Sequence, residues 1–277
     1  MKKSKRTILN LLLAAVFLFS ITQFVLQQRE NAAGESSYSD ALALATSGKT
    51  AVTQPESLPH AQEDTSSAEP KWVVAQPEED DPYIRELESM DLEALRQVNP
   101  DVVGWILIPD TVISYPILQG EDNDYYLKYT WDGKRYAMGS IFLEYQCSAD
   151  FTDFNTLVYG HNMTNGSMFA SLREYRNQEY WEKHPYVYIR SDQGVYRYEI
   201  FSSYLAKTTD NAYGIGFPSE NARIRFLDDI QKDSAITTGI EPEITDRILT
   251  LSTCSGRGKT TRWVVHARLK MVPEEPA

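Results

Sequence analysis

A cysteine, a histidine and an arginine each stand at one end of a short apolar stretch of this chain. Cys254 ends the stretch 248–253, and Arg262 opens another after seven intervening residues. Upstream, His161 ends the stretch 156–160. A thiol, an imidazole and a guanidinium can supply a nucleophile, a general acid or base, and an oxyanion donor. These groups predict acyl transfer through a thioester.

The surroundings of Cys254 favour a nucleophile over a small buried core residue. Five residues with the sequence Ser-Gly-Arg-Gly-Lys follow it, a flexible and basic loop. Nearby cations lower the pKa of a thiol and favour the reactive thiolate. In a strand with period two, Ser252 shares the face of Cys254, whereas Leu249, Leu251 and Thr253 point the other way. We expect Ser252 and the adjacent Thr253 to contact substrate.

Each partner of the cysteine has competitors. For the base they are His60, His184 and His266. His266 is expected inside the last strand, about 13 Å along it from Arg262, and is structural unless Cys254 packs beside the middle of that strand. Arg262 suits a developing oxyanion because a guanidinium stays charged and presents several donors in a fixed fork. Arg257 is its competitor, but two glycines flank it and position it poorly.

The second cysteine leaves a disulfide open. Cys147 follows the expected strand 140–145, and disulfides are common in exported proteins, so a bridge between Cys147 and Cys254 is an alternative to a free nucleophile. The four histidines and two cysteines show no metal-ligand spacing. A GxGxxG motif and a P-loop are both missing from the sequence, so we predict neither a metal nor another cofactor.

The N-terminus predicts export. Lys2, Lys3, Lys5 and Arg6 precede the apolar run 8–26, whose 19 residues would span about 28 Å as a helix, close to a bilayer core. The basic flank predicts a cytoplasmic N-terminus and an extracellular remainder. A cleaved signal peptide with residues 11–19 as its apolar region is the alternative. We favour an uncleaved anchor over residues 1–28, because no small-x-small site directly follows the apolar run.

The next segment is acidic and polar. Residues 29–82 hold eleven acidic and three basic residues, so this segment carries most of the formal charge of −12 of the whole chain. Such a composition buries too little apolar area to offset chain entropy, so we predict a disordered stalk over 29–82. The acidity argues against nucleic-acid binding.

From residue 83 onward the pattern is that of a small β-rich domain, expected over 83–277. Two short amphipathic helices are expected over 83–88 and 92–96, the second capped by Asp91. Further helices are expected over 168–175, 179–183 and 220–231. The expected strands are 103–108, 112–118, 140–145, 156–159, 186–190, 195–200, 201–206, 248–253 and 262–271. Many short strands with few helices predict a mainly β fold, a closed or nearly closed barrel.

Together these residues resemble a sortase, and in particular one of class B. The site motifs are Thr-Leu-Ser-Thr-Cys at 250–254, Tyr-Gly-His-Asn-Met at 159–163 and Arg262 before Trp-Val-Val-His-Ala-Arg-Leu. Typical class B motifs are Asn-Pro-Asp-Val-Val-Gly-Trp at 99–105, Ile-Ser-Tyr-Pro-Ile-Leu-Gln-Gly at 113–120, Gly-Ser-Ile-Phe-Leu at 139–143 and Trp-Glu-Lys-His-Pro at 181–185. The resemblance covers residues 83–270. The interval between Cys254 and Arg262 is shorter than in many class B members, which implies a compact loop.

The resemblance implies a closed eight-stranded sortase barrel and a membrane-anchored cysteine transpeptidase of a Gram-positive bacterium. His161, Cys254 and Arg262 map onto the catalytic residues of the family. The implied substrate is the sorting-signal peptide of a secreted surface protein, and the acceptor is an amine of the peptidoglycan precursor or of a pilin. Transfer to water would make the same site a thiol protease.

Two alternatives remain. A membrane-tethered binding or assembly protein on a sortase-like barrel would need no thiolate, and a disulfide between Cys147 and Cys254 would favour it. A papain-like protease places its cysteine early and its histidine late, the reverse of the order here.

Overall fold

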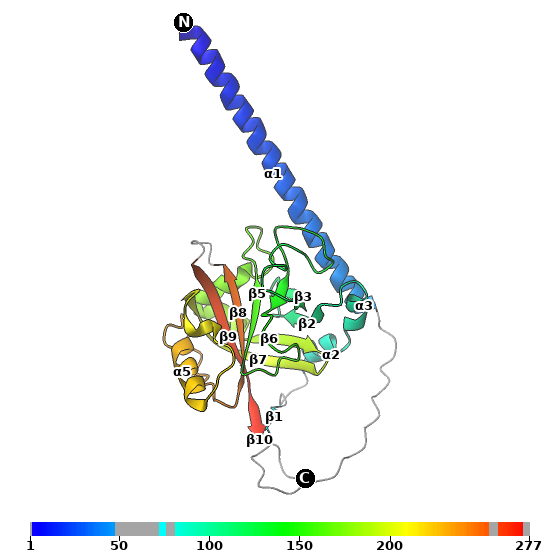
Figure 1. Cartoon of the computed structure of the whole chain (residues 1–277), viewed down its shortest axis with the longest axis vertical. Coiled ribbons are helices and arrows are strands. Elements are labelled where there is room, and N and C mark those ends of the chain that lie inside the picture. The colour runs from blue at the N-terminus through cyan, green and yellow to red at the C-terminus, as the bar shows by residue number, and fades with distance from the viewer. Residues whose placement is uncertain (1, 48–71, 76–80, 255–259, 274–277) are drawn as a thin grey trace.

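A closed barrel of eight strands forms the body of the protein, in the order β2-β3-β4-β5-β8-β9-β7-β6 (Figure 1). The computed structural model describes residues 2–47, 72–75, 81–254 and 260–273. The barrel strands are β2 Val102–Leu107, β3 Ser114–Leu118, β4 Ile141–Leu143, β5 Asn155–Gly160, β6 Tyr186–Ser191, β7 Gly194–Lys207, β8 Arg247–Cys254 and β9 Thr261–Leu269. The mainly β fold and its eight-stranded closure are as predicted.

Two apolar layers hold the barrel strands. Leu249 and Leu251 of β8 are fully buried in the main core cluster. Ile248 packs instead with Val264 in a second cluster beneath the helix α5, Glu220–Gln231. Successive residues of a strand point to opposite faces, so β8 serves both layers. The period-two alternation predicted for this strand is confirmed.

Short helices cover the barrel. They are α2 Pro82–Glu88, α3 Leu92–Arg96, η1 Ala170–Arg176, α4 Gln178–Lys183 and η2 Asn211–Tyr213. The predicted cap of α3 is confirmed, because the Asp91 carboxylate accepts from the Ala94 N–H at 2.9 Å. The helix predicted over 168–175 instead starts at Ala170 as a 3-10 helix. Met168 has φ +57°, a left-handed conformation that a right-handed helix does not continue through.

The longest strand joins two predicted ones. β7 runs unbroken through the expected strands 195–200 and 201–206, with a register shift against β9 between Ile200 and Ser202. A shift of this kind is a bulge, which bends a strand without ending it. The predicted hairpin at residues 191–194 is present, since Ser191 pairs with Gly194.

The N-terminal helix is longer than the predicted membrane anchor. α1 is continuous over Lys2–Ser47 and extends far from the barrel (Figure 1). Within the residues that the structure describes, it is the one helix long and apolar enough to cross a membrane, from Asn10 onward. The predicted disorder over 29–82 does not hold for residues 29–47, which are helical. Tyr38, Ala41 and Ala45 are buried because they recur at helical spacing on one face, and this spacing outweighs the polar composition.

Little of the remaining predicted stalk is described. Residues 48–71 and 76–80 lie outside the described residues. Between them, β1, Trp72–Val74, pairs antiparallel with β10, Met271–Pro273. The two strands form a separate ribbon outside the barrel. The expected strand 262–271 therefore ends at Leu269, and the chain leaves the barrel there.

We expect Leu249→Ala to lower the free energy of unfolding by about 2–5 kcal/mol, because it opens a cavity inside the closed barrel. Leu205→Ala on β7 is the matched control, since Leu205 is 41% exposed and its truncation should change stability by about 0.5 kcal/mol or less. Urea unfolding of both full-length variants, followed by tryptophan fluorescence, checks this. Equal losses would show that Leu249 does not face the interior.

Candidate active site

Strand pairing brings the three proposed catalytic positions to one edge of the barrel. β5 and β8 are parallel, and Gly160 pairs with Thr253. The residue that follows Gly160 is His161, and the residue that follows Thr253 is Cys254, so these two residues are also neighbours. β8 and β9 are antiparallel, and Cys254 pairs with Arg262. Neighbouring strands lie about 4.8 Å apart, so the backbones of the three residues are adjacent.

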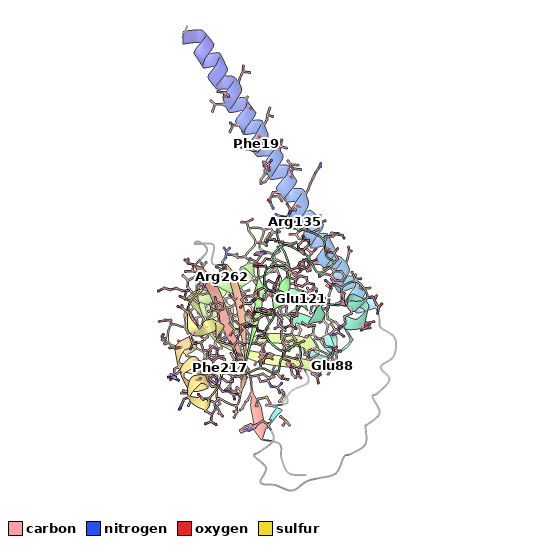
Figure 2. The ribbon with its side chains drawn as sticks, in the orientation of Figure 1. Phe19, Glu88, Glu121, Arg135, Phe217 and Arg262 are labelled. Atoms are coloured by element: carbon pink, nitrogen blue, oxygen red, sulfur yellow. The ribbon has the colours of Figure 1, made fainter. Side chains whose placement is uncertain are left out.

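A cavity of about 320 Å³ opens at this edge. His161, Arg262, Ser252 and Thr253 all line it. Its other lining side chains are Asn123, Leu127, Phe142, Tyr159, Thr208 and Tyr213. Figure 2 labels Arg262 at the end of the barrel from which α1 extends. Arg257 lies outside the described residues.

His161 is held by the loop between β3 and β4. Its Nε2 lies 2.7 Å from the carbonyl oxygen of Leu127. A carbonyl oxygen only accepts, so Nε2 carries the proton in this contact. The backbone of His161 is held as well, because its carbonyl accepts from the Phe169 N–H at 2.9 Å. Both contacts fix the direction in which the imidazole faces the cavity.

Ser252 and Thr253 are almost fully buried where they line the cavity. The Ser252 hydroxyl lies 3.3 Å from the Tyr213 hydroxyl. Thr253 Oγ1 has no hydrogen-bond partner among the described residues. A buried hydroxyl without a partner costs free energy.

Several lining residues carried no signal in the sequence. A buried carboxylate organises two of them: Glu144 accepts from Asn123 Nδ2 at 2.6 Å and from the Tyr159 hydroxyl at 2.9 Å. Burial raises the pKa of Tyr159, which keeps the hydroxyl protonated as a donor. Tyr159 stood in the Tyr-Gly-His motif and could have been singled out. Asn123 lies in a loop and Tyr213 ends the short 3-10 helix η2, and neither segment has a pattern that points to a site.

The competing histidines lie elsewhere. His266 is fully buried, and its Nδ1 lies 2.9 Å from Thr250 Oγ1. Burial lowers the pKa of His266 to about 3, so its ring is neutral. Thr250 Oγ1 also donates to Asn155 Oδ1 at 2.7 Å, which links β5, β8 and β9 inside the barrel wall. His184 Nδ1 contacts the Pro109 carbonyl at 3.0 Å, and His60 is outside the described residues.

Cys147 is a free, buried thiol, and its Sγ lies 3.8 Å from the carbonyl oxygen of Asn155. Asn155 begins β5. Gly160, at the other end of this strand and about 16 Å away, pairs with Thr253, the residue before Cys254. A disulfide needs Cα atoms within about 7 Å. A bridge between Cys147 and Cys254 would therefore require a large backbone movement. Burial also raises the pKa of the Cys147 thiol to about 12.

Metal-ligating side chains are scattered. Within the part of the chain that the structure describes, no three His, Cys, Asp or Glu residues converge as a metal site would require.

The comparisons with known proteins agree with one another. Residues 106–270 match the family model described as Sortase domain. Sortase B of Listeria monocytogenes is 42% identical over 166 residues, which cover 59% of this chain and 67% of that protein. Sortase B of Staphylococcus aureus is 34% identical over 174 residues, or 62% of this chain and 71% of that one. The structure of a Staphylococcus aureus sortase B–substrate complex superposes with a TM-score of 0.61 at 33% identity, covering 66% of this chain and 85% of that one.

The buried His266 should make stability depend on pH. The unfolded chain protonates this ring below about pH 6.5, whereas the folded chain resists protonation until about pH 3. Stability is therefore full above pH 6.5 and falls as the pH drops towards 3. We expect His266→Gln to reduce the slope of unfolding free energy against pH in this window by up to about 1.4 kcal/mol per pH unit. Urea titrations at a series of pH values measure the slope, and parallel curves for the two proteins would refute the assignment.

Cys147 should be unreactive in the folded protein. With its pKa raised to about 12, its thiolate at pH 8 is scarce, and we expect alkylation about a thousandfold slower than for an ordinary free thiol. Timed iodoacetamide labelling with peptide mapping measures the rate at each cysteine separately. The same labelling in urea is the control, because unfolding should expose Cys147 and remove the difference. Fast labelling of native Cys147 would contradict its placement.

Proposed function

Since this chain belongs to the sortase family of cysteine transpeptidases, and within it to class B, we propose that it cleaves the sorting-signal peptide of secreted surface proteins and joins the acyl part to an amine. The observation that carries this proposal is the strand pairing that brings the backbones of His161, Cys254 and Arg262 next to one another, at a barrel edge where His161 and Arg262 line one cavity. A nucleophile, a proton donor and an anion-stabilising cation are what a thioester route requires.

In the first half of the reaction, the Cys254 thiolate attacks the carbonyl carbon of the scissile peptide bond. The oxygen of the tetrahedral intermediate becomes an anion, which Arg262 stabilises. The C–N bond then breaks, and the leaving amine takes a proton from His161. Because Nε2 of His161 faces the Leu127 carbonyl, Nδ1 is the nitrogen that delivers this proton. The product is a thioester on Cys254 and a free amine.

In the second half, an amine attacks the thioester carbon and loses its proton to His161. The C–S bond breaks, and the Cys254 thiolate is restored together with a new amide bond. One of the similar solved structures is a sortase B in complex with triglycine, a peptide that ends in a free amino group. By analogy, we propose an amine of the peptidoglycan precursor or of a pilin as acceptor. Water in its place would give hydrolysis.

The cavity walls suit an extended peptide. Ser252 and Thr253, directly before Cys254 in the sequence, line the cavity, and we propose that they contact the substrate. Phe142 and Leu127 supply apolar surface, and Asn123, whose amide donates to Glu144, also lines the cavity. We propose an Asn-Pro type of sorting motif, as the class B membership suggests.

We also propose that residues 1–28 form a cytoplasmic tip and a single membrane anchor, with the catalytic domain over 83–277 outside the cell. The support is the length and hydropathy of α1 from Asn10 onward and the basic residues that precede it. Figures 1 and 2 show that the barrel end labelled by Arg262 lies on the side from which α1 extends. The site would then face the membrane surface, where lipid-linked acceptors are found.

Arg262 should act mainly on turnover. We expect Arg262→Ala to lower kcat by about 10²–10³ with little change in KM, because the charge it stabilises exists only in the transition state. Arg262→Lys should recover part of the loss, since it keeps the charge without the fork. Arg225→Ala on the exposed face of α5 is the matched control. The assay is cleavage of a sorting-signal peptide by the full-length chain in detergent micelles, and a change confined to KM would contradict the oxyanion role.

A further inference from the structure

We propose that the end of α1 beyond the membrane anchor, residues 30–45, is a positioning element of the catalytic site, and that Tyr38 is the residue through which it holds His161. This inference rests on the proposed role of His161 as the proton donor and acceptor. It gives the anchor helix a second task besides tethering. The helix is docked on the barrel beside the two segments that hold the imidazole.

The docking is close and specific. A Cβ atom at Gly34 would overlap Sδ of Met138, so the helix backbone lies directly on the loop before β4. The Trp131 indole donates to the carbonyl of Ser37 at 2.9 Å, and the Ala137 N–H donates to the Glu30 carboxylate at 2.9 Å. At the end of the helix, the Asp91 N–H donates to the Ala45 carbonyl at 2.9 Å. Four contacts along four turns fix both the position and the rotation of the helix.

Tyr38 is the centre of this interface. It is 6% exposed, and its hydroxyl donates to the carbonyl of Gly139 at 2.6 Å. The same hydroxyl lies 3.2 Å from Ser140 Oγ. Its ring packs edge-on against Tyr115, with centroids 5.2 Å apart and an interplanar angle of 84°. From these three neighbours, two chains of contacts run to His161.

The first chain ends at the imidazole. The Ser140 N–H donates to the Tyr126 carbonyl at 2.8 Å, and Ser140 Oγ donates to the Tyr129 carbonyl at 2.8 Å. These two carbonyls flank Leu127, whose own carbonyl accepts from His161 Nε2 at 2.7 Å. Through Ser140, Tyr38 therefore supports both ends of the turn 126–129, which orients the His161 imidazole.

The second chain ends at the backbone. The Tyr115 hydroxyl accepts from the Met168 N–H at 3.0 Å, and Met168 has a left-handed conformation that needs such support. Met168 pairs with Asn162, the residue after His161, in an isolated bridge. The next residue, Phe169, donates its N–H to the His161 carbonyl. The imidazole and the backbone of His161 are thus both connected, through these contacts, to Tyr38 on α1.

A second contact from α1 supports the same segment. The Glu35 carboxylate accepts from Asn165 Nδ2 at 2.7 Å, at the tip of the loop that follows His161. The barrel itself closes through strands within residues 102–269, and all its pairings are independent of α1. Loss of Tyr38 should therefore loosen the two segments that hold His161 while the barrel stays folded. A misplacement of about 1 Å at a reacting group can cost about a hundredfold in rate.

The test compares Tyr38→Phe and Tyr38→Ala in the full-length chain in detergent micelles, with Ser36→Ala on the exposed face of the same turn as the control. Tyr38→Phe keeps the ring against Tyr115 and removes the bonds to Gly139 and Ser140. We expect kcat to fall about tenfold or more in Tyr38→Ala and less in Tyr38→Phe, with KM within about twofold of wild type. Ser36→Ala should leave both unchanged. The urea midpoint of each variant reports whether the barrel is folded.

A second readout follows the imidazole directly. The chain has four histidines, and ¹³C-labelled ring signals can be assigned to His161 by their loss in His161→Gln. Loosening of the Leu127 contact should move the pH midpoint of the His161 signal in both Tyr38 variants and leave it unmoved in Ser36→Ala. A purely structural role for Tyr38 would change the urea midpoint alone.

The outcomes separate the two proposals. If His161→Ala turns over peptide as fast as wild type, the role of His161 in the proposed function is wrong. If His161→Ala is inactive but Tyr38→Phe keeps both the wild-type kcat and the wild-type His161 titration, the positioning role of Tyr38 is overturned and the proposed function stands. If Tyr38→Ala unfolds, Tyr38→Phe alone decides between these results.

Discussion

The parallel hydrogen-bonded pairing of β5 with β8 is the constraint on which the site depends. Their residues are about 93 positions apart in the chain, yet the pairing runs in register from Asn155 with Ile248 to Gly160 with Thr253. When two parallel strands end at the same level, the residues that follow them lie at the same edge of the sheet. A slip of one residue would turn every side chain of β8 to the opposite face and carry Cys254 away from His161.

A buried polar link in the barrel wall fixes this register. Thr250 on β8 donates to Asn155 on β5, and its hydroxyl contacts His266 on β9. These are the three strands whose ends carry His161, Cys254 and Arg262. Hydrogen bonds between buried groups are costly to lose, so they specify one alignment where an all-apolar wall would tolerate several. His266, the strongest rival for the base, thus supports the site from the layer between the barrel wall and α5, where its ring packs against Tyr204 and Phe226.

Much of this could be predicted from the sequence, because short-range patterns carry it. The alternation along β8, the cap at Asp91 and the two-residue hairpin after Ser191 are local, and all three are present. The docked part of α1 was missed because its burial depends on Met138 and Tyr115, which lie about 80–100 residues away. Asn123 and Tyr213 were missed for the same reason, since tertiary contacts alone bring them to the cavity. The alternative of an inactive tethered protein loses its structural support, because Cys147 sits at the far end of β5.

The most direct test of thioester chemistry at Cys254 is the mass of the full-length chain after brief incubation with Asn-Pro-type sorting-signal peptides and an acid quench. We expect a mass increase equal to the acyl fragment on the N-terminal side of the scissile bond, mapped to Cys254 and discharged into a ligated product when an amine is added. An adduct on Cys147, or peptide cleavage that persists in Cys254→Ala, would contradict it.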